Sequence, residues 1–289
     1  MKKIYLLMML LATVFVACSD DDDKDEKDDD KDKETPWEIK MTVNVEKTTE
    51  FNFELSDGYH DLSAYTIDWG DGSEAKSFEN TRYPSHYYDQ GTYSITVKGS
   101  GSVRFYHDQR YQSRSFNITS LDVSNCTTLV SLTCCGHQLT SLDVTKCTAL
   151  ETLQCEINQL TSLDVTKCTA LETLQCEINQ LTSLDVTKCT ALKALWCNDN
   201  QLTSLDVTKC TALKNFGCGV NQLTSLDITK CPNLEQLHCD HNNFDDNAMN
   251  AIYNGLPDRT GKETGIIYID GNDAKGNTAI ALNKNWNVD

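Results

Sequence analysis

Residues 139–159 spell LTSLDVTKCTALETLQCEINQ, and residues 160–180 repeat the same letters without a change. Further copies with increasing drift follow to residue 243, and a more degenerate copy precedes them at residues 118–138. A fixed period of about 20 to 50 residues is typical of solenoid proteins, in which each unit is too small to bury its own apolar face. We therefore expect residues 118–243 to form six stacked coils of 21 residues, with other structure at each end.

Each coil contains a short segment with an alternating pattern. Leu153 and Cys155 are two positions apart, so both side chains point to the same side of an extended chain. Thr152, Gln154 and Glu156 then point to the other side, which we expect to face solvent. A single coil would leave its apolar row exposed, and the coils must therefore stack on one another.

An asparagine recurs at the bend that follows each of these segments. Its amide can donate to and accept from backbone groups of its own coil and the next, and a buried polar group left unpaired costs roughly 1–3 kcal/mol. We therefore predict a structural ladder rather than a binding site. The ladder comprises Asn158, Asn179, Asn200, Asn221 and Asn242, with His137 in the same position of the first copy.

Most of the 14 cysteines fall into two columns of the repeat, while Cys135 takes an outward position of the degenerate first copy. Neighbours in a column would lie about 4.8 Å apart with parallel Cβ vectors, whereas a disulfide needs Cβ atoms about 3.8 Å apart that turn toward each other. A zinc site needs four ligands that converge on one point, and the columns are lines. We therefore expect buried free thiols and no metal. The columns are Cys126, Cys147, Cys168, Cys189, Cys210 and Cys231, and Cys134, Cys155, Cys176, Cys197, Cys218 and Cys239.

The spacing L-x-x-L-x-C-x-x-N-x-L, counted from Leu150, resembles the leucine-rich repeat, with cysteine in the third apolar position. The cysteine column and the LDVT segment make the unit similar to the internalin J-like repeats of bacterial surface proteins. This resemblance covers residues 118–243. It implies a mainly β fold, namely a curved leucine-rich repeat solenoid with a parallel sheet on its concave face.

The first residues carry the pattern of a bacterial lipoprotein. Lys2 and Lys3 precede an apolar run at 4–16, and Cys18 after a small residue resembles a lipobox, which predicts a signal peptide at 1–17 and lipid on Cys18. Residues 18–36 are mostly acidic and predict a hydrated, disordered tether. The Ser-Asp-Asp-Asp-Asp run after Cys18 resembles a Bacteroidetes-type lipoprotein export signal, which implies an outer-membrane anchor and display on the cell surface. The alternative to lipidation is an ordinary secreted or membrane-anchored chain, and the alternative to the export signal is a generic charged linker.

Alternating apolar residues from Trp37 onward predict short half-buried strands, which together make a small β-sandwich at residues 37–100. The Trp-Gly-Asp-Gly-Ser turn at 69–73 and the segment GTYSITV at 91–97 resemble the PKD domain, an immunoglobulin-like module. We expect this module to act as a spacer between membrane and solenoid. Asp68 and Asp71 are expected to stabilise the turn rather than to bind calcium.

Both ends of the repeat array need a cover for the apolar edge of the terminal coil. Residues 101–117, with Phe105, Tyr106 and Tyr111, are assigned to the N-terminal cap. Residues 244–289 are assigned to an α+β C-terminal cap, in which Asp246 is expected to cap a helix that runs to about Asn254.

The sequence favours binding over catalysis. It contains no Gly-rich phosphate loop and no paired nucleophile and base, and it suggests no cofactor. A metal site at His238 and His241 is disfavoured because His238 points outward from one coil while His241 lies near the bend. The formal net charge of −18 argues against nucleic acid as a partner. Membrane contact is expected only through the Cys18 lipid, and we expect a monomer.

Outward positions of the sheet form rows across the coils, and these rows begin to vary after the two identical copies. Trp196 takes the position of Gln175, and an outward tryptophan without a core role suits a binding anchor, although it could also only shield its neighbours. We therefore expect an adhesin-like surface protein that binds a protein ligand through the concave face. The alternatives are a glycan-binding accessory of an uptake system and a purely structural rod. The expected contact residues are Glu156, Gln175, Glu177, Trp196, Asn198, Asn215 and His238.

Overall fold

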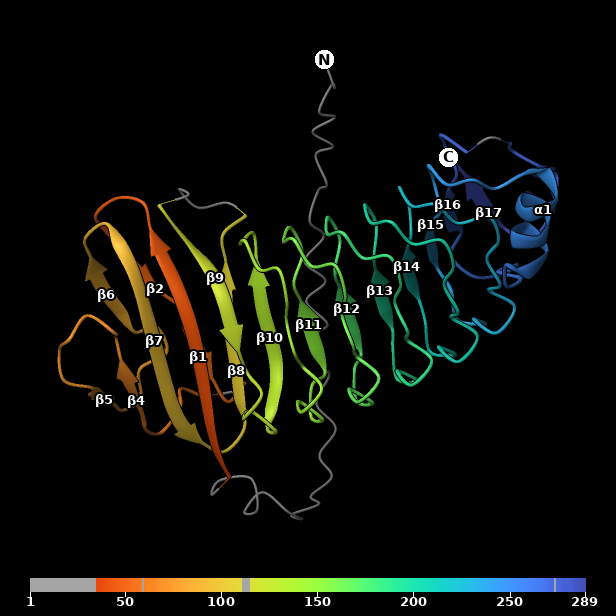
Figure 1. Ribbon diagram of the computed structural model, residues 1–289. Helices are drawn as coiled ribbons and strands as arrows, with labels where there is room; N and C mark the ends of the chain where they lie inside the picture. The colour runs from red at the N-terminus through yellow and green to blue at the C-terminus, as the bar shows by residue number, and fades with distance from the viewer. Residues whose placement is uncertain (1–34, 59, 111–114, 273) are drawn as a thin grey trace, which may run out of the picture.

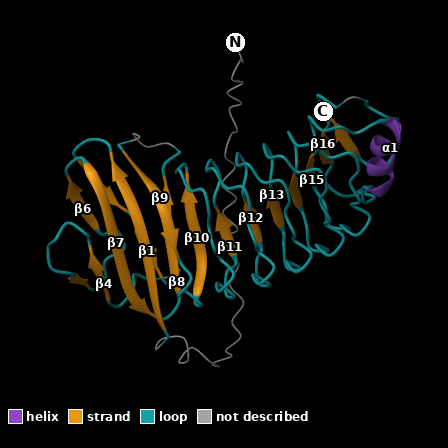
Figure 2. Ribbon diagram, viewed as in Figure 1, coloured by secondary structure: helices purple, strands orange, loops and turns teal. Residues whose placement is uncertain are grey.

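The computed structural model describes residues 35–58, 60–110, 115–272 and 274–289. The expected signal peptide at 1–17, the expected lipidation site Cys18 and the tether up to residue 34 lie outside the described residues, as does Tyr111. Figure 1 shows an N-terminal β unit followed by a row of stacked coils and a C-terminal segment that carries a helix. Strands and loops dominate the fold (Figure 2). Within the described ranges, none of the helices is long and apolar enough to cross a membrane.

The N-terminal unit is built from strands whose side chains alternate between core and solvent. β1 buries Trp37, Ile39, Met41, Val43 and Val45 on one face, as its period of two predicts. A five-stranded antiparallel sheet has the order β5-β4-β7-β1-β9, and β2 pairs with β6 in a second sheet. The strands are β1 (Pro36–Val45), β2 (Thr49–Asn52), β3 (Glu54–Ser56), β4 (Tyr65–Asp68), β5 (Lys76–Phe78), β6 (Ser85–Tyr88), β7 (Gly91–Ser100), β8 (Val103–Asp108) and β9 (Phe116–Asp122).

The Trp-Gly-Asp-Gly-Ser turn after β4 is held by its own carboxylates. Asp68 Oδ1 accepts a hydrogen bond from the Gly70 N–H at 2.9 Å, and Asp71 Oδ1 accepts one from the Ser73 N–H at 3.0 Å. Gly70 has a φ of +72°, and a Cβ at this position would lie 2.2 Å from the Ser94 carbonyl oxygen. Both carboxylates therefore stabilise the turn, as the sequence predicts.

The repeats form one parallel sheet with one strand from each coil. Leu153 lies opposite Leu132 and Leu174, and the same spacing of 21 residues relates every pair of neighbours from β10 to β15. Columns in the sequence are thus lines in space, and the predicted register is confirmed. The strands are β10 (Leu129–Cys135), β11 (Thr152–Gln154), β12 (Thr173–Gln175), β13 (Ala194–Trp196), β14 (Asn215–Gly217) and β15 (Gln236–His238).

Leucine and cysteine columns fill the interior of the coil stack. Leu153 and Cys155 are fully buried, and all described cysteines are buried and free, which confirms the predicted free thiols for this part of the chain. The thiol of Cys168 donates to the Val144 carbonyl of the preceding coil at 3.5 Å, and burial raises the pKa of Cys168 to about 12. These thiols are therefore protonated and pack as small apolar groups.

The predicted asparagine ladder is present. Asn179 Oδ1 accepts from the Leu160 N–H at 3.0 Å. Its Nδ2 donates to the Cys155 carbonyl of the preceding coil at 3.0 Å, and to the Cys176 and Glu177 carbonyls of its own coil at 3.1 and 3.3 Å. One side chain thus satisfies four buried backbone groups across two coils. The same bonds recur at Asn158, Asn200, Asn221 and Asn242.

The N-terminal unit and the solenoid share their sheets. β8 pairs parallel with β10 and antiparallel with β3, so a strand of the N-terminal unit extends the solenoid sheet. β9 pairs instead with β1, although it runs into the first expected coil. Strand pairing therefore crosses the expected domain boundaries at residues 100 and 117. Through this pairing the N-terminal unit covers the open edge of the first coils.

Two buried histidines lie at this junction. His137 Nδ1 accepts from the Ile118 N–H at 3.3 Å, and its Nε2 lies 2.8 Å from Nδ1 of His107. This arrangement assigns the proton of His137 to Nε2, which donates to His107. His107 stacks on Phe51 with the ring centroids 5.5 Å apart. Burial lowers the pKa of His107 to about 4, and burial together with His107 lowers the pKa of His137 to about 3.

The C-terminal segment continues the sheet and closes the far end. β16 (Gly265–Tyr268) and β17 (Trp286–Val288) add to it in parallel, with α1 (Asp246–Gly255) and the short α2 (Ala279–Leu282) beside them. The predicted helix cap is wrong by one position. Asp245 has the extended backbone that a cap requires and accepts from the Ala248 N–H at 2.8 Å, whereas Asp246 is already helical.

Candidate functional site

The outward side of the parallel sheet carries side chains in rows that run across the coils. Gln154 lies opposite Gln175, and Gln175 lies opposite Trp196. The same row continues through β14 and β15 into β16 of the C-terminal segment. We call this set the central row; it comprises Thr133, Gln154, Gln175, Trp196, Gly217, His238 and Tyr268.

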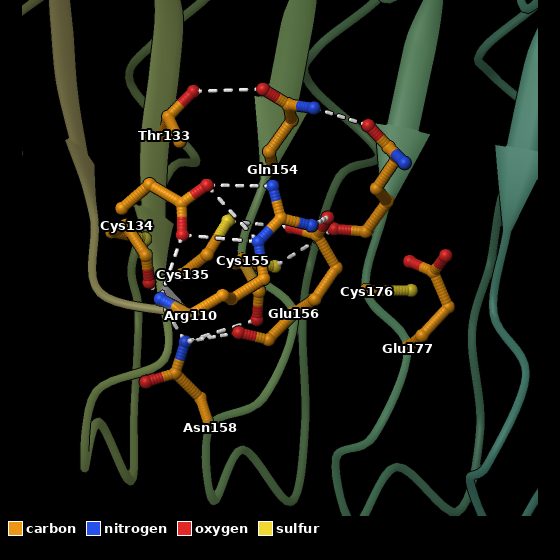
Figure 3. A network of polar contacts seen from close by, with 12 residues as sticks. Arg110, Thr133, Cys134, Cys135, Gln154, Cys155, Glu156, Asn158, Cys176 and Glu177 are labelled. Atoms are coloured by element: carbon orange, nitrogen blue, oxygen red, sulfur yellow. Dashed lines mark hydrogen bonds and ion pairs between the residues drawn. The ribbon is translucent and has the colours of Figure 1, made fainter. Parts of the chain in front are cut away.

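The first half of the central row is a ladder of polar side chains. Thr133 Oγ1 donates to Gln154 Oε1 at 2.9 Å, and Gln154 Nε2 donates to Gln175 Oε1 (Figure 3). These bonds hold the amides in fixed orientations, which reduces the side-chain entropy that a ligand would have to remove on binding. The ladder ends at Gln175, directly beside Trp196 in the sheet.

The second half of the central row is aromatic. Trp196 lies over Gly217, where an added Cβ would come within 2.4 Å of the Trp196 ring atom Cε3. Because Gly217 has no side chain, Trp196 reaches His238 two coils along, with ring centroids 5.2 Å apart at 70°. His238 then stacks on Tyr268 with centroids 4.2 Å apart at 30°. The three rings make one aromatic surface across four strands.

Trp196 differs from the other tryptophans. Trp37, Trp69 and Trp286 are only 3%, 1% and 1% exposed and belong to the core, whereas Trp196 is half-buried on the sheet face. Its outward direction agrees with the sequence prediction, although its contacts with Gly217 and His238 leave only part of the ring accessible. The geometry fits both a binding anchor and a shield over the sheet.

Tyr268 belongs to the central row but was missed by the sequence analysis. It lies outside the 21-residue repeats, in a segment assigned only to the C-terminal cap. The available signal was the strand-like run Ile266-Ile267-Tyr268-Ile269. Because β16 pairs with β15 although α1 lies between them in the chain, every second residue of this run continues the outward row.

Glu156, an expected contact residue, is only 3% exposed, and the prediction that it faces solvent is wrong. Arg110 Nη1 lies 2.8 Å from Glu156 Oε1, and the Cys135 thiol donates to Oε2 at 2.7 Å (Figure 3). Arg110 follows β8 and also binds Asp108, so it covers this end of the sheet face. Cys135 is buried for the same reason, despite its outward position.

Asn198 is also less accessible than expected, at 9% exposed. Its Oδ1 accepts from the Gly219 N–H of the next coil at 2.7 Å, which gives the side chain a structural partner. Of the other expected contact residues, Gln175, Glu177, Trp196, Asn215 and His238 are half-buried on the sheet face. The structure thus leaves these five side chains partly exposed and buries those of Glu156 and Asn198.

Acidic side chains lie on one side of the central row. Burial and the neighbouring Glu156 raise the pKa of Glu177 to about 8. Burial and Asp240 also raise the pKa of Asp199 above its usual value. His238 accepts from the Gln236 amide at 2.6 Å, and burial lowers its pKa, so it is neutral at neutral pH.

The described side chains near this face include aromatic rings and amides, and buried thiols lie beneath them. Within the described ranges, no group of three or more His, Cys, Asp or Glu side chains is arranged to hold a metal ion. Burial raises the pKa of Cys155 far above the usual thiol value, so it is not a ready nucleophile. Aromatic rings beside ordered amides are suited to contact a ligand surface.

The single strand per 21-residue coil, the inward leucine and cysteine columns and the asparagine ladder define a mainly β leucine-rich repeat solenoid. Neither a family model nor a curated protein matches the chain. Among solved structures, the internalin InlF from Listeria monocytogenes is similar at 22% identity with a TM-score of 0.52, over 57% of this chain and 48% of that one. This likeness supports the fold alone.

Two further internalin structures from Listeria monocytogenes are similar to this chain. The functional domain of InlJ, which includes a cysteine ladder, matches at 28% identity and a TM-score of 0.46, over 60% of this chain and 41% of that one. Internalin C2 matches at 20% identity and a TM-score of 0.49, over 57% of this chain and 73% of that one. The chain thus spans less than half the length of the InlJ and InlF structures.

Proposed function

We propose that this chain is an adhesin-like surface protein that binds a protein ligand through the outward face of its parallel sheet. The observation that carries this proposal is the aromatic half of the central row. On the outward side of the sheet, Trp196 contacts His238 two coils along, and His238 stacks on Tyr268 of the adjacent strand β16. Large rings with one accessible face are the side chains that most often dominate protein interfaces.

The repeat architecture supports binding in a second way. The inward leucine, cysteine and asparagine positions carry the fold, so the outward positions are free to vary with little effect on stability. The outward row changes from Gln154 and Gln175 to Trp196, Gly217 and His238, while the inward columns stay nearly constant. A purely structural rod would not require this change.

The proposed setting is the cell surface. The expected signal peptide at 1–17, lipidation of Cys18 and the acidic tether would attach the chain to the outer membrane through its N-terminus. The PKD-like interpretation of the N-terminal unit belongs to the same proposal, with this unit between the tether and the ligand-binding face. The chain is proposed to act as a monomer, without cofactor, nucleic acid or catalytic activity.

A glycan ligand is the second candidate. The observation that favours it is the ordered pair of amides of Gln154 and Gln175, which the Thr133 hydroxyl holds at one end and which ends beside Trp196. Sugar hydroxyls bond well to amides held in fixed orientations, and sugar rings pack on aromatic faces. A glycan array with the wild-type chain, followed by competition of each hit against the captured protein ligand, separates the two candidates.

The test uses the chain immobilised through its N-terminal region and exposed to surface extracts. Trp196→Ala and His238→Ala are expected to weaken capture of a protein ligand by about tenfold or more each, as truncated interface anchors do. Lys188→Ala, an exposed position away from the sheet face, is the matched control and should bind like the wild type. Equal capture by the wild type and both aromatic variants would remove the proposed surface.

A further inference from the structure

Residues 139–159 and 160–180 are identical in sequence, so Glu156 and Glu177 occupy the same position in neighbouring coils. Each glutamate directly follows the inward cysteine of the second column, Cys155 or Cys176. Because the coils stack in register, the backbone presents both carboxylates in the same way. Any difference in what they bind therefore comes from their surroundings.

The position of Glu156 holds a guanidinium group. Arg110 Nη1 lies 2.8 Å from Glu156 Oε1, and Arg110 Nη2 lies 2.7 Å from Asp108 Oδ2. The Cys135 thiol donates to the other oxygen of Glu156 at 2.7 Å. This position of the coil can thus hold an arginine side chain against the sheet face, where burial strengthens a charge-assisted hydrogen bond.

Glu177 presents the same group without that partner. Its Oε2 is buried, and no described residue donates a hydrogen bond to it. Figure 3 shows Glu177 to one side of the network that surrounds Arg110 and Glu156. Burial and the charge of Glu156 raise the pKa of Glu177 to about 8, although the positive charge of Arg110 opposes this shift. A buried polar atom of this kind calls for a partner.

The surroundings of Glu177 fit a long side chain with a cationic end. Asp199 acts on Glu177 electrostatically and adds negative charge, and Asp240 acts in turn on Asp199. Ile178, the next residue, is 49% exposed, and Val220 at the same position two coils further is 40% exposed. An arginine combines a charged end for the carboxylates with an apolar stem that can lie on these residues.

We propose that Glu177 is the recognition site for an arginine side chain of the protein ligand, and that it repeats on the open sheet face the guanidinium-binding position that Arg110 fills at Glu156. This inference rests on the proposed function for the identity of the ligand. It adds a charged contact beside the aromatic half of the central row. A planar guanidinium matches a carboxylate through two parallel hydrogen bonds, which a lysine ammonium cannot form.

The test uses N-acetyl-arginine amide as the probe and follows the side-chain carboxyl signals by NMR in the full chain. The probe is expected to bind with a millimolar Kd and to shift the Glu177 signal. Glu177→Gln should weaken binding by about tenfold or more, because the charge-assisted bonds are lost. Binding should also be tighter at pH 9 than at pH 6, because the probe binds the deprotonated carboxylate.

Three controls make this result specific. Glu235→Gln, at an exposed glutamate of the last coil, should bind the probe like the wild type. N-acetyl-norvaline amide, which lacks the guanidinium, should not bind, and N-acetyl-lysine amide should bind more weakly than the arginine probe. Equal binding by Glu177→Gln and the wild type, or equal binding of the norvaline and arginine probes, would overturn the proposal.

The chain itself supplies one competing arginine. Arg114 lies outside the described residues, and an Arg114→Gln variant tests whether it is the partner of Glu177. If only this variant binds the probe, the chain's own arginine is the occupant and the proposal is wrong. If the wild type binds the probe, the proposed arginine site holds. This result does not depend on whether Trp196→Ala changes protein capture, so the arginine site and the proposed function can be disproved separately.

Discussion

Glu177 lies on the sheet face one coil away from Glu156, and only Glu156 has an arginine among the described residues bound to it. Oε2 of Glu177 is buried without a donor, which disfavours the charged form of the carboxyl, and burial together with Glu156 raises its pKa to about 8. Burial raises the pKa of both glutamates, but only Glu156 has an arginine within ion-pair distance among the described residues. Binding of a cationic group would favour the charged form of Glu177.

The first prediction concerns the pH dependence of stability at Glu177. Its pKa is about 8 in the folded chain against a usual value of 4.5, so between these values the folded state binds more protons than the unfolded state. The free energy of unfolding contributed by this group therefore falls as pH rises through that window. Glu177→Gln should be more stable than the wild type at pH 9, by on the order of 1–3 kcal/mol, in urea unfolding.

The difference between Glu177→Gln and the wild type should shrink as the pH falls toward 4.5, because the carboxyl is then neutral in the folded chain. Glu235→Gln, at an exposed position, serves as the matched control and should show no such change. A pH-independent difference for Glu177→Gln would show that the carboxylate is compensated in the folded chain.

A second residue-scale prediction concerns the bend before the asparagine ladder. Ile178 has a φ of +53°, a left-handed conformation that is unfavourable for a β-branched residue, and its side chain is 49% exposed. Asparagine tolerates this conformation, and little apolar burial would be lost. Ile178→Asn should therefore raise the free energy of unfolding by about 1 kcal/mol. Reduced stability of this variant in urea would mean that the Ile178 side chain contributes packing that outweighs the strain.

At the scale of the element, the inward contacts of each coil follow from its own sequence. The accessibility of its outward side chains depends on the residues of the neighbouring coils. The period of 21 residues predicted the register, the asparagine ladder and the buried thiols, because these depend only on contacts between identical positions of successive coils. It did not predict the accessibility of Trp196 or Asn198. Both side chains pack over Gly217 in the next coil, where a side chain is missing, and Asn198 also accepts a hydrogen bond from the Gly219 N–H.

The element-scale prediction tests this dependence. In Gly217→Ala the new Cβ would lie 2.4 Å from Trp196 Cε3, so the indole must move outward. The other tryptophans are at most 3% exposed, so iodide quenching of fluorescence reports mainly on Trp196. Quenching should increase in Gly217→Ala and stay unchanged in Asn215→Ala, which alters the same strand in the adjacent row. Equal quenching in the wild type and Gly217→Ala would contradict the packing described for Trp196.

At the scale of the whole molecule, the junction between the N-terminal unit and the solenoid was the part that the sequence predicted least well. Arg110 reaches Glu156 over 46 positions of sequence, and His107 reaches His137 over 30. Such contacts have no period, and they join a strand outside the repeats to the first coils. The expected cap at 101–117 gave no indication of them, so the burial of Glu156 and Cys135 could not be foreseen.

The junction makes the whole molecule sensitive to acid. The pKa values of His107 and His137 are lowered to about 4 and about 3 from 6.5, because burial disfavours the charged ring. Between pH 6.5 and 4 the unfolded chain therefore binds more protons than the folded chain, and the free energy of unfolding decreases as the pH falls. The nearby Asp108 carboxylate opposes the pKa shift at both rings but does not cancel it. In His137→Asn, which restores the residue of the later coils, this loss should be smaller in thermal unfolding.

His60→Asn changes an exposed histidine of the N-terminal unit and is the control for the acid experiment. Its difference in Tm from the wild type should be the same at pH 6.5 and pH 4. If His137→Asn also kept a constant difference from the wild type, the buried pair would not be the acid-sensitive element of the junction.

The central claim is that the ligand lies on the sheet face over the aromatic half of the central row. The most direct measurement is fluorine NMR of the chain labelled with fluorotryptophan, in which the Trp196 signal is identified by Trp196→Phe and a soluble gadolinium chelate reports exposure. Binding of a captured ligand should protect Trp196 from broadening and leave the buried Trp37, Trp69 and Trp286 unchanged. Full occupancy by the ligand with undiminished broadening of Trp196 would contradict the claim.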